Sequence, residues 1–311
     1  MSLLRQPILL LARSQQVKKL ISTMPVSSGI VAGYVPGETT EAAIEATARL
    51  VQDGLAVTLD FLGEDTLDAA QAQHTVAAYV EVLESLSTRA LARRAEVSVK
   101  LSAIGQALPG DGQQVALENA RTICRAARNA GTTVTLDMED HTTTDRTLEI
   151  LRELRKDFPE TGAVLQAALH RTEADCKALA HEGSRVRLCK GAYLEPETVA
   201  YRDKHDIDKA FVRCLKILLA GPGYPMIATH DPRMVEIASS LASRYGRAQG
   251  TYEFQMLYGI RPEEQKRLAA AGETMRVYLP YGVEWYGYLM RRLAEKPGNV
   301  SMFVRSLISK G

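Results

Sequence analysis

The sequence predicts an α/β fold, a (β/α)8 barrel of the TIM type, from three observations. Short stretches rich in β-branched and aliphatic residues alternate with amphipathic helical segments along the chain. No low-complexity linker or shift in composition divides the 311 residues. A chain of this length accommodates one such barrel. We therefore expect a single catalytic domain over 1–311, with N-terminal helices in 1–54 and the barrel and C-terminal helices in 55–311.

The expected elements follow from the local patterns. A helix is expected over 40–52, and two or so helical stretches before it are extra to the barrel repeat. Further helices are expected over 68–86 and 115–131, the second ending at Gly131, a typical helix terminator. The predicted strands are 55–61, 96–102, 132–138, 163–169, 185–191, 225–230, 250–256 and 275–280.

The same alternation would also suit an open, doubly wound parallel sheet. The dinucleotide-binding form of that sheet carries a G-x-G-x-x-G motif after its first strand, and no such motif follows 55–61. The barrel is therefore the favoured architecture.

Composition excludes several functional classes. The net charge is +1 and no run of lysines or basic aromatic patch is present, so we expect no nucleic-acid partner. The four cysteines form no C-x-x-C pair, which argues against a zinc site or a disulfide framework. The apolar run from Ile8 to Ala12 is too short to span a membrane and has no cleavage site after it. We expect a cytoplasmic protein.

Polar side chains mark the ends of most predicted strands. In a (β/α)8 barrel the catalytic groups come from the carboxyl ends of the strands. Buried charges there are costly unless they are paired or functional, so several on successive strands indicate a site. These residues are Lys100, Asp137, Glu139, Gln166, Arg187, Lys190, Thr229, His230, Gln255 and Tyr278.

Several chemistries suit such a site. A metal site would use Asp137, Glu139, His141, His170 and His230, although no H-E-x-x-H motif and no His-x-His on the first strand is present. Lys100 with a lowered pKa would suit a Schiff-base enzyme. A flat anionic cofactor with a small carboxylate substrate would use the basic residues at the mouth. A barrel that only binds a ligand is the non-enzymatic alternative.

One helix near the C-terminus carries an unusual face. Tyr288, Arg291, Arg292 and Glu295 follow one another at i, i+3, i+4 and i+7, so they share a side of the helix. A solvated surface with its own charge pair is one interpretation. The other is a carboxylate site, because planar guanidinium groups bind carboxylates through two parallel hydrogen bonds.

Six motifs in order resemble the proline dehydrogenase family. They are VSVKLS (97–102), LDMED (136–140), RVRLCKGAY (185–193), ATHD (228–231), FQMLYG (254–259) and RVYLPYG (276–282), followed by Y-x-x-R-R at 288–292. The resemblance spans roughly 55–306. We see no second catalytic domain in the sequence, so it resembles the monofunctional, bacterial type of the family.

The resemblance implies a reaction. Members use non-covalent FAD and oxidise L-proline to Δ1-pyrroline-5-carboxylate, the first step of proline catabolism, by moving a hydride from C5 to flavin N5. Electrons then pass to a membrane quinone, and a separate pyrroline-5-carboxylate dehydrogenase acts downstream. A peripheral position at the inner face of the membrane is expected from the reaction, and amphipathic segments near either end would support it. The eighth helix is expected over the barrel mouth.

The resemblance also implies roles for individual residues. Asp137 and Arg187 are the expected catalytic positions. Asp137 is expected to organise the site through Lys100 or through the Tyr278 hydroxyl, and no motif assigns it a direct role as a base. Glu64 is expected to form a gate with Arg291, of undetermined sense. The expected cofactor-binding residues are Met138, Gln166, Arg187, Lys190, Gly191, Ala192, Tyr193, Thr229, His230 and Gln255. The expected substrate-binding residues are Lys100, Leu188, Tyr278, Tyr288, Arg291 and Arg292. No metal is expected.

Overall fold

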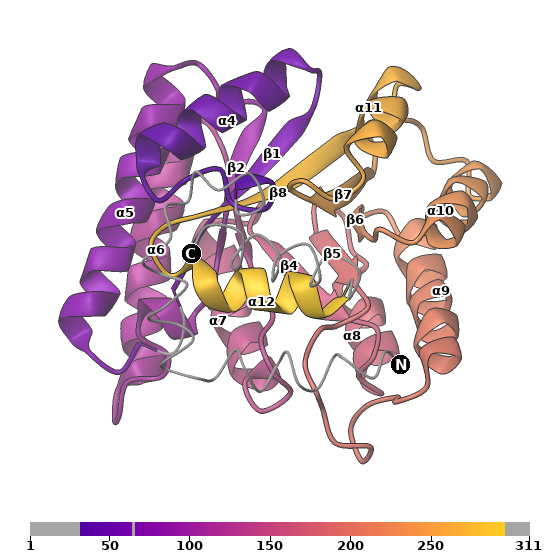
Figure 1. Cartoon of the computed structure of the whole chain (residues 1–311). Coiled ribbons are helices and arrows are strands. Elements are labelled where there is room, and N and C mark those ends of the chain that lie inside the picture. The colour runs from indigo at the N-terminus through magenta and orange to yellow at the C-terminus, as the bar shows by residue number, and fades with distance from the viewer. Residues whose placement is uncertain (1–31, 64–65, 296–311) are drawn as a thin grey trace, which may run out of the picture.

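Eight parallel strands close into a barrel in the computed structural model, which describes residues 32–63 and 66–295, with side chains as far as residue 292 (Figure 1). Each strand pairs with the next, and β8 pairs with β1. The predicted (β/α)8 barrel is therefore confirmed, and the open sheet is excluded. The strands are β1 (Ala56–Phe61), β2 (Ala95–Val99), β3 (Val134–Leu136), β4 (Gly162–Gln166), β5 (Arg185–Cys189), β6 (Tyr224–Ala228), β7 (Glu253–Leu257) and β8 (Met275–Tyr281).

Helices follow the strands around the outside of the barrel. They are α4 (Thr40–Gln52), α5 (Ala69–Thr88), α6 (Gly112–Ala130), α7 (Thr144–Asp157), α8 (Thr172–Leu179), α9 (Lys204–Ala220), α10 (Pro232–Arg244), α11 (Pro262–Ala270) and α12 (Trp285–Glu295), with a 3-10 turn, η1 (Ser102–Ile104). The additional helical stretches expected before residue 40 fall in 1–31, outside the described residues.

Capping side chains explain where several helices begin and end. The Asp68 carboxylate accepts a hydrogen bond from the Ala70 amide at 2.8 Å, and Asp231 caps α10 ahead of Pro232. Gly131 ends α6 with a φ of 82°, which a residue without a side chain adopts at little cost. The helix predicted over 40–52 has these bounds in the structure.

Most predicted strands run too far at their carboxyl ends. The second was expected to reach residue 102 and the third residue 138, but their ladders end at Val99 and Leu136. The seventh begins three residues later than expected, because a turn at 248–251 precedes it, with the Thr251 amide donating to the Ala248 carbonyl at 3.1 Å. As a correction, Arg187 and Gln255 lie in the middle of their strands, inside the barrel, and not at strand ends.

The strands have two different sides. Successive side chains alternate between the barrel interior and the surrounding helices. Outward residues such as Leu59 and Val97 pair across β1 and β2 and belong to the large apolar core. The intervening residues are largely polar, so the interior of this barrel holds the charged groups.

Helix α12 is arranged differently from the others. It begins four residues after the end of β8 and lies crosswise to α5 and α9, as expected of a helix over the barrel mouth (Figure 1). The Trp285 indole nitrogen donates a hydrogen bond to the Glu38 carboxylate at 2.7 Å, which fixes the start of α12 to the segment before α4.

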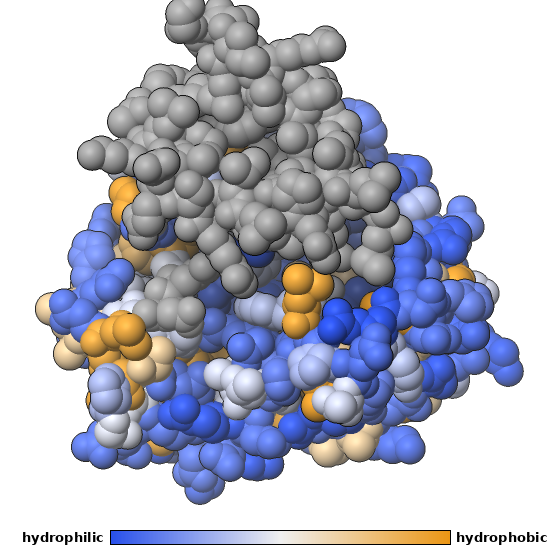
Figure 2. Space-filling view, turned by 60° about the horizontal axis from the view of Figure 1, so that its bottom comes forward, coloured by the Kyte–Doolittle hydropathy of each residue, from blue (hydrophilic) through white to orange (hydrophobic). Residues whose placement is uncertain are grey.

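One face of the molecule shows how apolar side chains are distributed on the described surface. On the face seen in Figure 2, described residues are mostly hydrophilic, and hydrophobic ones lie in small separate groups. Within 32–63 and 66–295, no helix combines the length and the apolar content that crossing a bilayer requires.

Candidate active site

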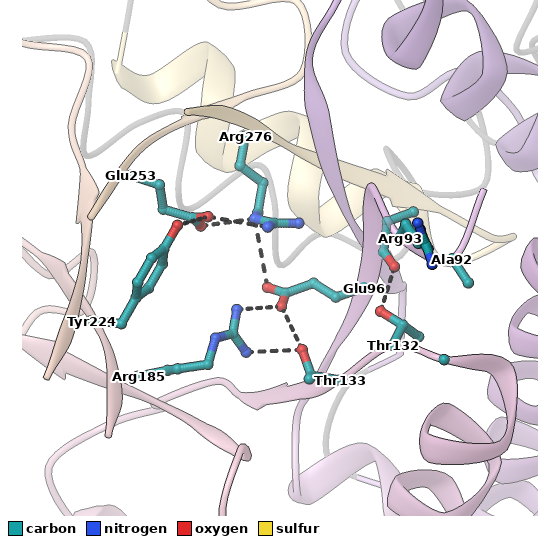
Figure 3. Close-up of a pocket in the computed structure, with 11 residues that line it drawn as sticks. Ala92, Arg93, Glu96, Thr132, Thr133, Arg185, Tyr224, Glu253 and Arg276 are labelled. Carbon is teal, nitrogen blue, oxygen red and sulfur yellow. Dashed lines mark hydrogen bonds and ion pairs between the residues drawn. The ribbon is translucent and has the colours of Figure 1, made fainter. Parts of the chain in front are cut away.

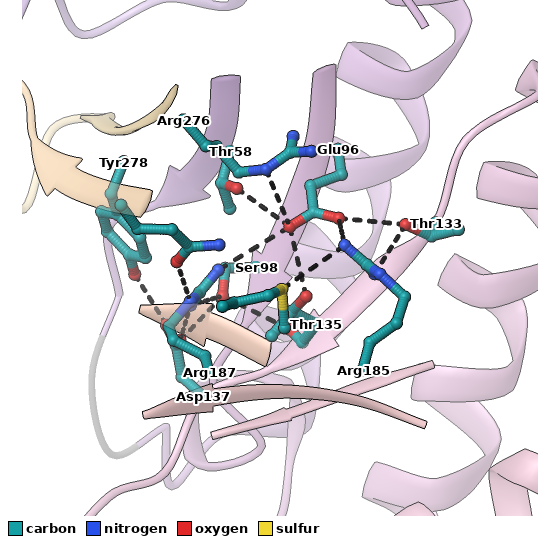
Figure 4. A network of polar contacts seen from close by, with 12 residues as sticks. Thr58, Glu96, Ser98, Thr133, Thr135, Asp137, Arg185, Arg187, Arg276 and Tyr278 are labelled. Atoms are coloured by element: carbon teal, nitrogen blue, oxygen red, sulfur yellow. Dashed lines mark hydrogen bonds and ion pairs between the residues drawn. The ribbon is translucent and has the colours of Figure 1, made fainter. Parts of the chain in front are cut away.

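Asp137, which follows β3, is the centre of a buried group of polar side chains (Figure 4). Its Oδ1 accepts hydrogen bonds from Ser98 Oγ at 2.7 Å and Arg187 Nη1 at 2.8 Å, and its Oδ2 accepts one from the Tyr278 hydroxyl at 2.6 Å. Burial by itself would raise the pKa of Asp137, but the charges of Lys100 and Arg187 and the hydrogen bonds lower it overall. Asp137 is therefore an ionised anchor that joins β2, β3, β5 and β8.

Lys100 is held by carboxylates. Its Nζ lies 2.6 Å from Asp60 Oδ2 and 3.7 Å from Asp137 Oδ2. Burial would lower the pKa of Lys100, yet Asp60, Asp137 and Glu139 raise it above its usual value. A Schiff-base lysine needs a lowered pKa to be a free amine. The structure thus argues against that alternative, and it adds Asp60 to the site.

Arg187 is nearly fully buried and is fixed by several partners. Its Nε donates to Gln255 Oε1 at 2.5 Å, and its Nη2 lies 3.8 Å from Glu96 Oε1. Its guanidinium carbon is 5.3 Å from the centre of the Tyr278 ring. Because the guanidinium has these fixed neighbours, its positive charge has a preorganised position at the centre of the barrel.

Gly191 creates room for a ligand at the end of β5. Its φ is +102°, and a Cβ there would lie 3.3 Å from Gln166 Oε1 and 3.4 Å from the Ala168 Cβ. Gln166 in turn donates to the Glu139 carbonyl at 2.8 Å, which fixes its side chain. A side chain at 191 would fill this place, so the backbone here is open to the close approach of a flat group.

A cationic group lies beside β5 and β6. Lys190 Nζ contacts Asp208 at 2.5 Å and Asp231 at 3.1 Å. Lys204 and Arg233 contact the same two carboxylates. Three cations thus face two carboxylates, and the surplus positive charge suits a phosphate.

Thr229 and His230 follow β6 next to this group. Thr229 Oγ1 accepts a hydrogen bond from the Asp231 amide at 3.2 Å. His230 Nε2 accepts one from the Leu257 amide at 2.9 Å, so the neutral ring carries its proton on Nδ1. His230 thereby holds the segment after β6 to the end of β7, whereas the Thr229 side chain stabilises the turn after β6.

The arginines of α12 are not fully solvated. Arg291 and Arg292 are both partly buried, and Tyr288 is 6% exposed. The guanidinium carbon of Arg292 lies 5.3 Å from the centre of the Tyr288 ring, as their i, i+4 spacing predicts. This argues against the interpretation of the helix face as a plain surface. The side chain of Glu295 lies outside the described part.

Some predicted residues lie elsewhere. Leu188 follows the inward-facing Arg187, so alternation turns it to the helix side, where it is 1% exposed in the apolar core. Its expected contact with a substrate is therefore not supported. Met138 is also buried against this core, whereas Ala192 and Tyr193 are exposed. Glu64 lies outside the described residues, and its gate with Arg291 remains a prediction.

The sequence analysis missed an ionic network next to Arg187, on the side toward the amino-terminal ends of the strands (Figure 4). Arg185 lies 2.5 Å from Glu96, and Arg276 lies 2.7 Å from Glu253 and 3.9 Å from Glu96. Burial opposes the charge of Glu96, but the arginines hold its pKa well below the usual range. The available signal was the polar residue at every second position of E-V-S-V, R-V-R, E-F-Q and R-V-Y.

The residues considered for a metal site are engaged separately. Asp137 lies in the buried group, Glu139 accepts from Ser102, His141 contacts Glu195, His170 stacks against Tyr201, and His230 accepts from the backbone. In the part of the chain that the structure describes, no three His, Cys, Asp or Glu side chains are grouped to hold a metal ion.

Comparisons with known proteins agree with this geometry. A family model described as proline dehydrogenase matches residues 43–305. The chain is 39% identical over 308 residues to proline dehydrogenase of Deinococcus radiodurans, covering 98% of each chain. It is 34% identical over 308 residues to proline dehydrogenase 1 of Bacillus subtilis strain 168, covering 99% of this chain and 100% of that protein.

A solved structure shares the fold. Proline utilization A from Bdellovibrio bacteriovorus, inactivated by N-propargylglycine, superposes with a TM-score of 0.80 at 24% identity, covering 92% of this chain and 38% of that longer one. The extent of the family match and the identity to relatives of similar length show that the chain belongs to the proline dehydrogenase family.

Proposed function

We propose that the protein oxidises L-proline to Δ1-pyrroline-5-carboxylate with non-covalent FAD as cofactor and a membrane quinone as electron acceptor. The observation that carries the proposal is the mostly buried contact of Lys100, Asp137, Arg187 and Tyr278 toward the carboxyl end of the barrel. Membership of the family supports the class of reaction, and this cluster supports the proposal that the reaction occurs here.

Gly191 is the feature that best fits a bound flavin. The missing side chain lets the backbone approach a flat ring beside Gln166, and the cations around Lys190 suit its phosphates. Bound FAD would supply the acceptor, at flavin N5, for the hydride that leaves C5 of proline. The residues proposed to hold it are Met138, Gln166, Arg187, Lys190, Gly191, Ala192, Tyr193, Thr229, His230 and Gln255.

Arg187 has the clearest catalytic role in this proposal. Its fixed cation stabilises the negative charge that develops as the hydride is transferred, in a site with little water. Asp137 holds Arg187 and Tyr278 in place and balances the buried charge. Both residues therefore act by position and charge.

The charge and the ring of proline suggest which residues bind it. Proline carries a carboxylate, for which Lys100, Arg291 and Arg292 are the proposed partners, and a largely apolar ring, against which the flat side chains of Tyr278 and Tyr288 are proposed to pack. Lys100 is also held by Asp60 and Asp137, so the arginines of α12 are proposed to add further positive charge for the carboxylate. Leu188 is left out of this set because of its position on the helix side.

Neither Asp137 nor Tyr278 is suited to accept the amine proton of proline. The lowered pKa of Asp137 makes it a poor base, and the pKa of Tyr278 is raised well above its usual value by burial and by Asp137 and Asp60. We infer that the amine loses its proton to solvent. The role of Asp137 is then one of positioning.

Electron transfer to a membrane quinone requires contact with the membrane, so a cytoplasmic protein peripheral to the inner face of the membrane is proposed. A separate pyrroline-5-carboxylate dehydrogenase would consume the product. In support, the chain matches proteins of similar length over 98–100% of their sequence, whereas it matches 24% of the bifunctional PutA of Escherichia coli.

Analysis of the purified protein tests the proposal. The extracted cofactor should have the mass of FAD, and incubation with L-proline and a soluble quinone should produce the cyclic imine, detected by chemical trapping. A protein that neither contains nor takes up FAD, or one that forms no imine, would contradict the proposal.

A further inference from the structure

Glu253, the first residue of β7, is fully buried and faces four hydrogen-bond donors. Its Oε1 accepts from Gln255 Nε2 at 2.5 Å and from Arg276 Nε at 2.7 Å. Its Oε2 accepts from Arg276 Nη2 and from the Tyr224 hydroxyl, both at 3.1 Å. Figure 3 shows Glu253 with Arg276 and Tyr224 among the residues that line a cavity of about 330 Å³. Glu253 and Tyr224 are the first residues of β7 and β6, so this group lies at the amino-terminal end of the barrel. The role described above gives it no part in the reaction.

The chemistry of a carboxylate fixes the orientation of Gln255. An ionised carboxylate can only accept hydrogen bonds, whereas an amide has a donating and an accepting end. Glu253, paired with Arg276, therefore requires the NH2 end of Gln255 to face it. The carbonyl end of Gln255 is then directed toward Arg187, whose Nε–H it accepts at 2.5 Å.

The opposite orientation of Gln255 would be unfavourable at both ends. Its carbonyl would face the Glu253 carboxylate, and its NH2 group would face the Nε–H of Arg187. An acceptor would then face an acceptor at one end of the amide, and a donor would face a donor at the other. Both pairs are buried, and unsatisfied buried polar groups are costly. Glu253 is acceptor-only, so it selects one orientation.

We propose that Glu253 is a positioning residue for the reaction, which acts through Gln255 to hold the Arg187 guanidinium in place. The proposal rests on the proposed function, in which the Arg187 cation stabilises the charge developed by hydride transfer. A residue at the amino-terminal end of the barrel would thus control a group of the active site at the other end, through one side chain.

Three variants test this role. Glu253→Gln has nearly the same shape but can present an NH2 group to Gln255 and so permits the flipped amide. The double variant Glu253→Gln/Gln255→Glu exchanges carboxylate and amide, so that the Arg187 Nε–H again meets an acceptor and the net charge is kept. The Arg276 Nε–H, however, loses the oxygen of residue 253 that it shares with Gln255. Tyr224→Phe is the matched control, because it removes another donor to the same carboxylate without affecting the orientation of Gln255.

Rapid mixing of each flavin-loaded protein with L-proline gives two quantities: the limiting rate of flavin reduction and the proline concentration at which half of that rate is reached. Glu253→Gln should lower the limiting rate at least about tenfold, the size expected for a misplaced hydrogen bond to a charged group. The half-saturating proline concentration should stay within about threefold, because the carboxylate ligands are unchanged. The double variant should be faster than Glu253→Gln, because the Arg187 Nε–H again faces an acceptor, but slower than the unaltered protein, because Arg276 Nε has lost one. Tyr224→Phe should stay within about twofold of the unaltered rate.

Three results would overturn the proposal: an unchanged rate in Glu253→Gln, a double variant no faster than the single one, or a Tyr224→Phe protein as slow as Glu253→Gln. The last would show that the floor of the barrel matters only for general stability.

NMR can follow the exchange of the Arg187 Nε–H proton with solvent. This measurement tests the hydrogen bond from Arg187 to Gln255 without any reaction, and it can be made on the unaltered protein even if Glu253→Gln does not fold. The proton should exchange slowly in the unaltered protein and faster in Glu253→Gln. Fast exchange in the unaltered protein would contradict the Gln255 hydrogen bond. If proline fails to reduce the flavin of the unaltered protein, the proposed function fails, and the exchange experiment still decides the positioning claim.

Discussion

Arg187 joins side chains from four strands, and its guanidinium contacts Ser98, Asp137 and Gln255. Replacement by Met keeps much of the length but removes the cation that the proposal places near the flavin. We expect turnover to fall about 10²–10³-fold, as for the loss of one preorganised donor, and the flavin midpoint potential to become more negative. Arg187→Lys should recover turnover only in part, because an ammonium cannot reproduce the planar fork.

Measurement of the midpoint potential by titration with a reference dye decides the role of Arg187. The variant also leaves Asp137 with one cation fewer, so thermal unfolding has to be measured alongside. A folded Arg187→Met protein with unaltered turnover and potential would remove this residue from the flavin site.

Asp137 provides a prediction about pH. Its pKa is held below the usual value of about 3.9, so it stays ionised from mildly acidic to alkaline pH and cannot give the activity an acidic limb there. We expect kcat/KM to rise with pH as the substrate amine loses its proton. Asp137→Asn should lower the whole profile, because one acceptor oxygen becomes a donor facing Tyr278 or Arg187, but should leave the acidic limb in place. Loss of that limb in the variant would identify Asp137 as the base instead.

At the scale of the element, α12 tests the substrate site. Arg291→Met and Arg292→Met should each raise the KM for proline about tenfold or more, since a charge-assisted hydrogen bond contributes about 1.5–3 kcal/mol. Flavin content should not change. The matching Lys variants should recover part of the affinity. Steady-state kinetics over a range of proline concentrations gives the result.

An exposed arginine on another helix gives the control. Arg49 on α4 has 65% of its side chain exposed, and Arg49→Met should leave KM unchanged. A shift below about twofold for both arginines of α12, as for ordinary surface charges, would assign them to the surface and remove the carboxylate site.

The elements were predictable to different degrees. The helix over 40–52 and the centres of the strands follow from local patterns and capping residues, which act within a few positions. The strand ends were placed too late, because residues such as Lys100 and Asp137 continue the local pattern after the ladder has ended. Where a parallel ladder ends depends on the neighbouring strand, which the local sequence does not specify.

At the scale of the whole molecule, the barrel and the residues at its mouth were foreseen, while the network below them was not. Arg185 and Glu96 contact each other across 89 positions, and Arg276 and Glu253 meet only because the register of β7 and β8 places them together. Such pairs depend on how the barrel closes. The family motifs indicated Arg187 and Asp137 together with Lys100, Gln255 and Tyr278, but not Ser98 and Glu96, which also contact Arg187.

The network also predicts how stability depends on pH. The pKa of Glu96 in the folded protein lies well below its unfolded value of about 4.3, so Glu96 stabilises the fold above that pH and loses its contribution as pH falls. Glu96→Gln should cost about 3–5 kcal/mol at neutral pH, because Arg185 and Arg276 lose a buried partner. The difference from the unaltered protein should shrink as the pH falls below about 4.

Denaturant unfolding at several pH values measures this difference. Glu153→Gln, which removes an exposed ion pair with Lys156, is the control and should have little effect. A deficit in Glu96→Gln that stays constant with pH would show that shape, and not charge, sets the contribution of this residue.

Anaerobic titration of the purified, flavin-containing protein with L-proline tests the central claim most directly. If the barrel mouth is a proline-oxidising flavin site, the yellow colour should bleach, with about one imine formed for each flavin reduced. Arg187→Met should bleach far more slowly at saturating proline. A flavin that keeps its colour in the unaltered protein at saturating proline, under conditions where dithionite bleaches it, would contradict the assignment.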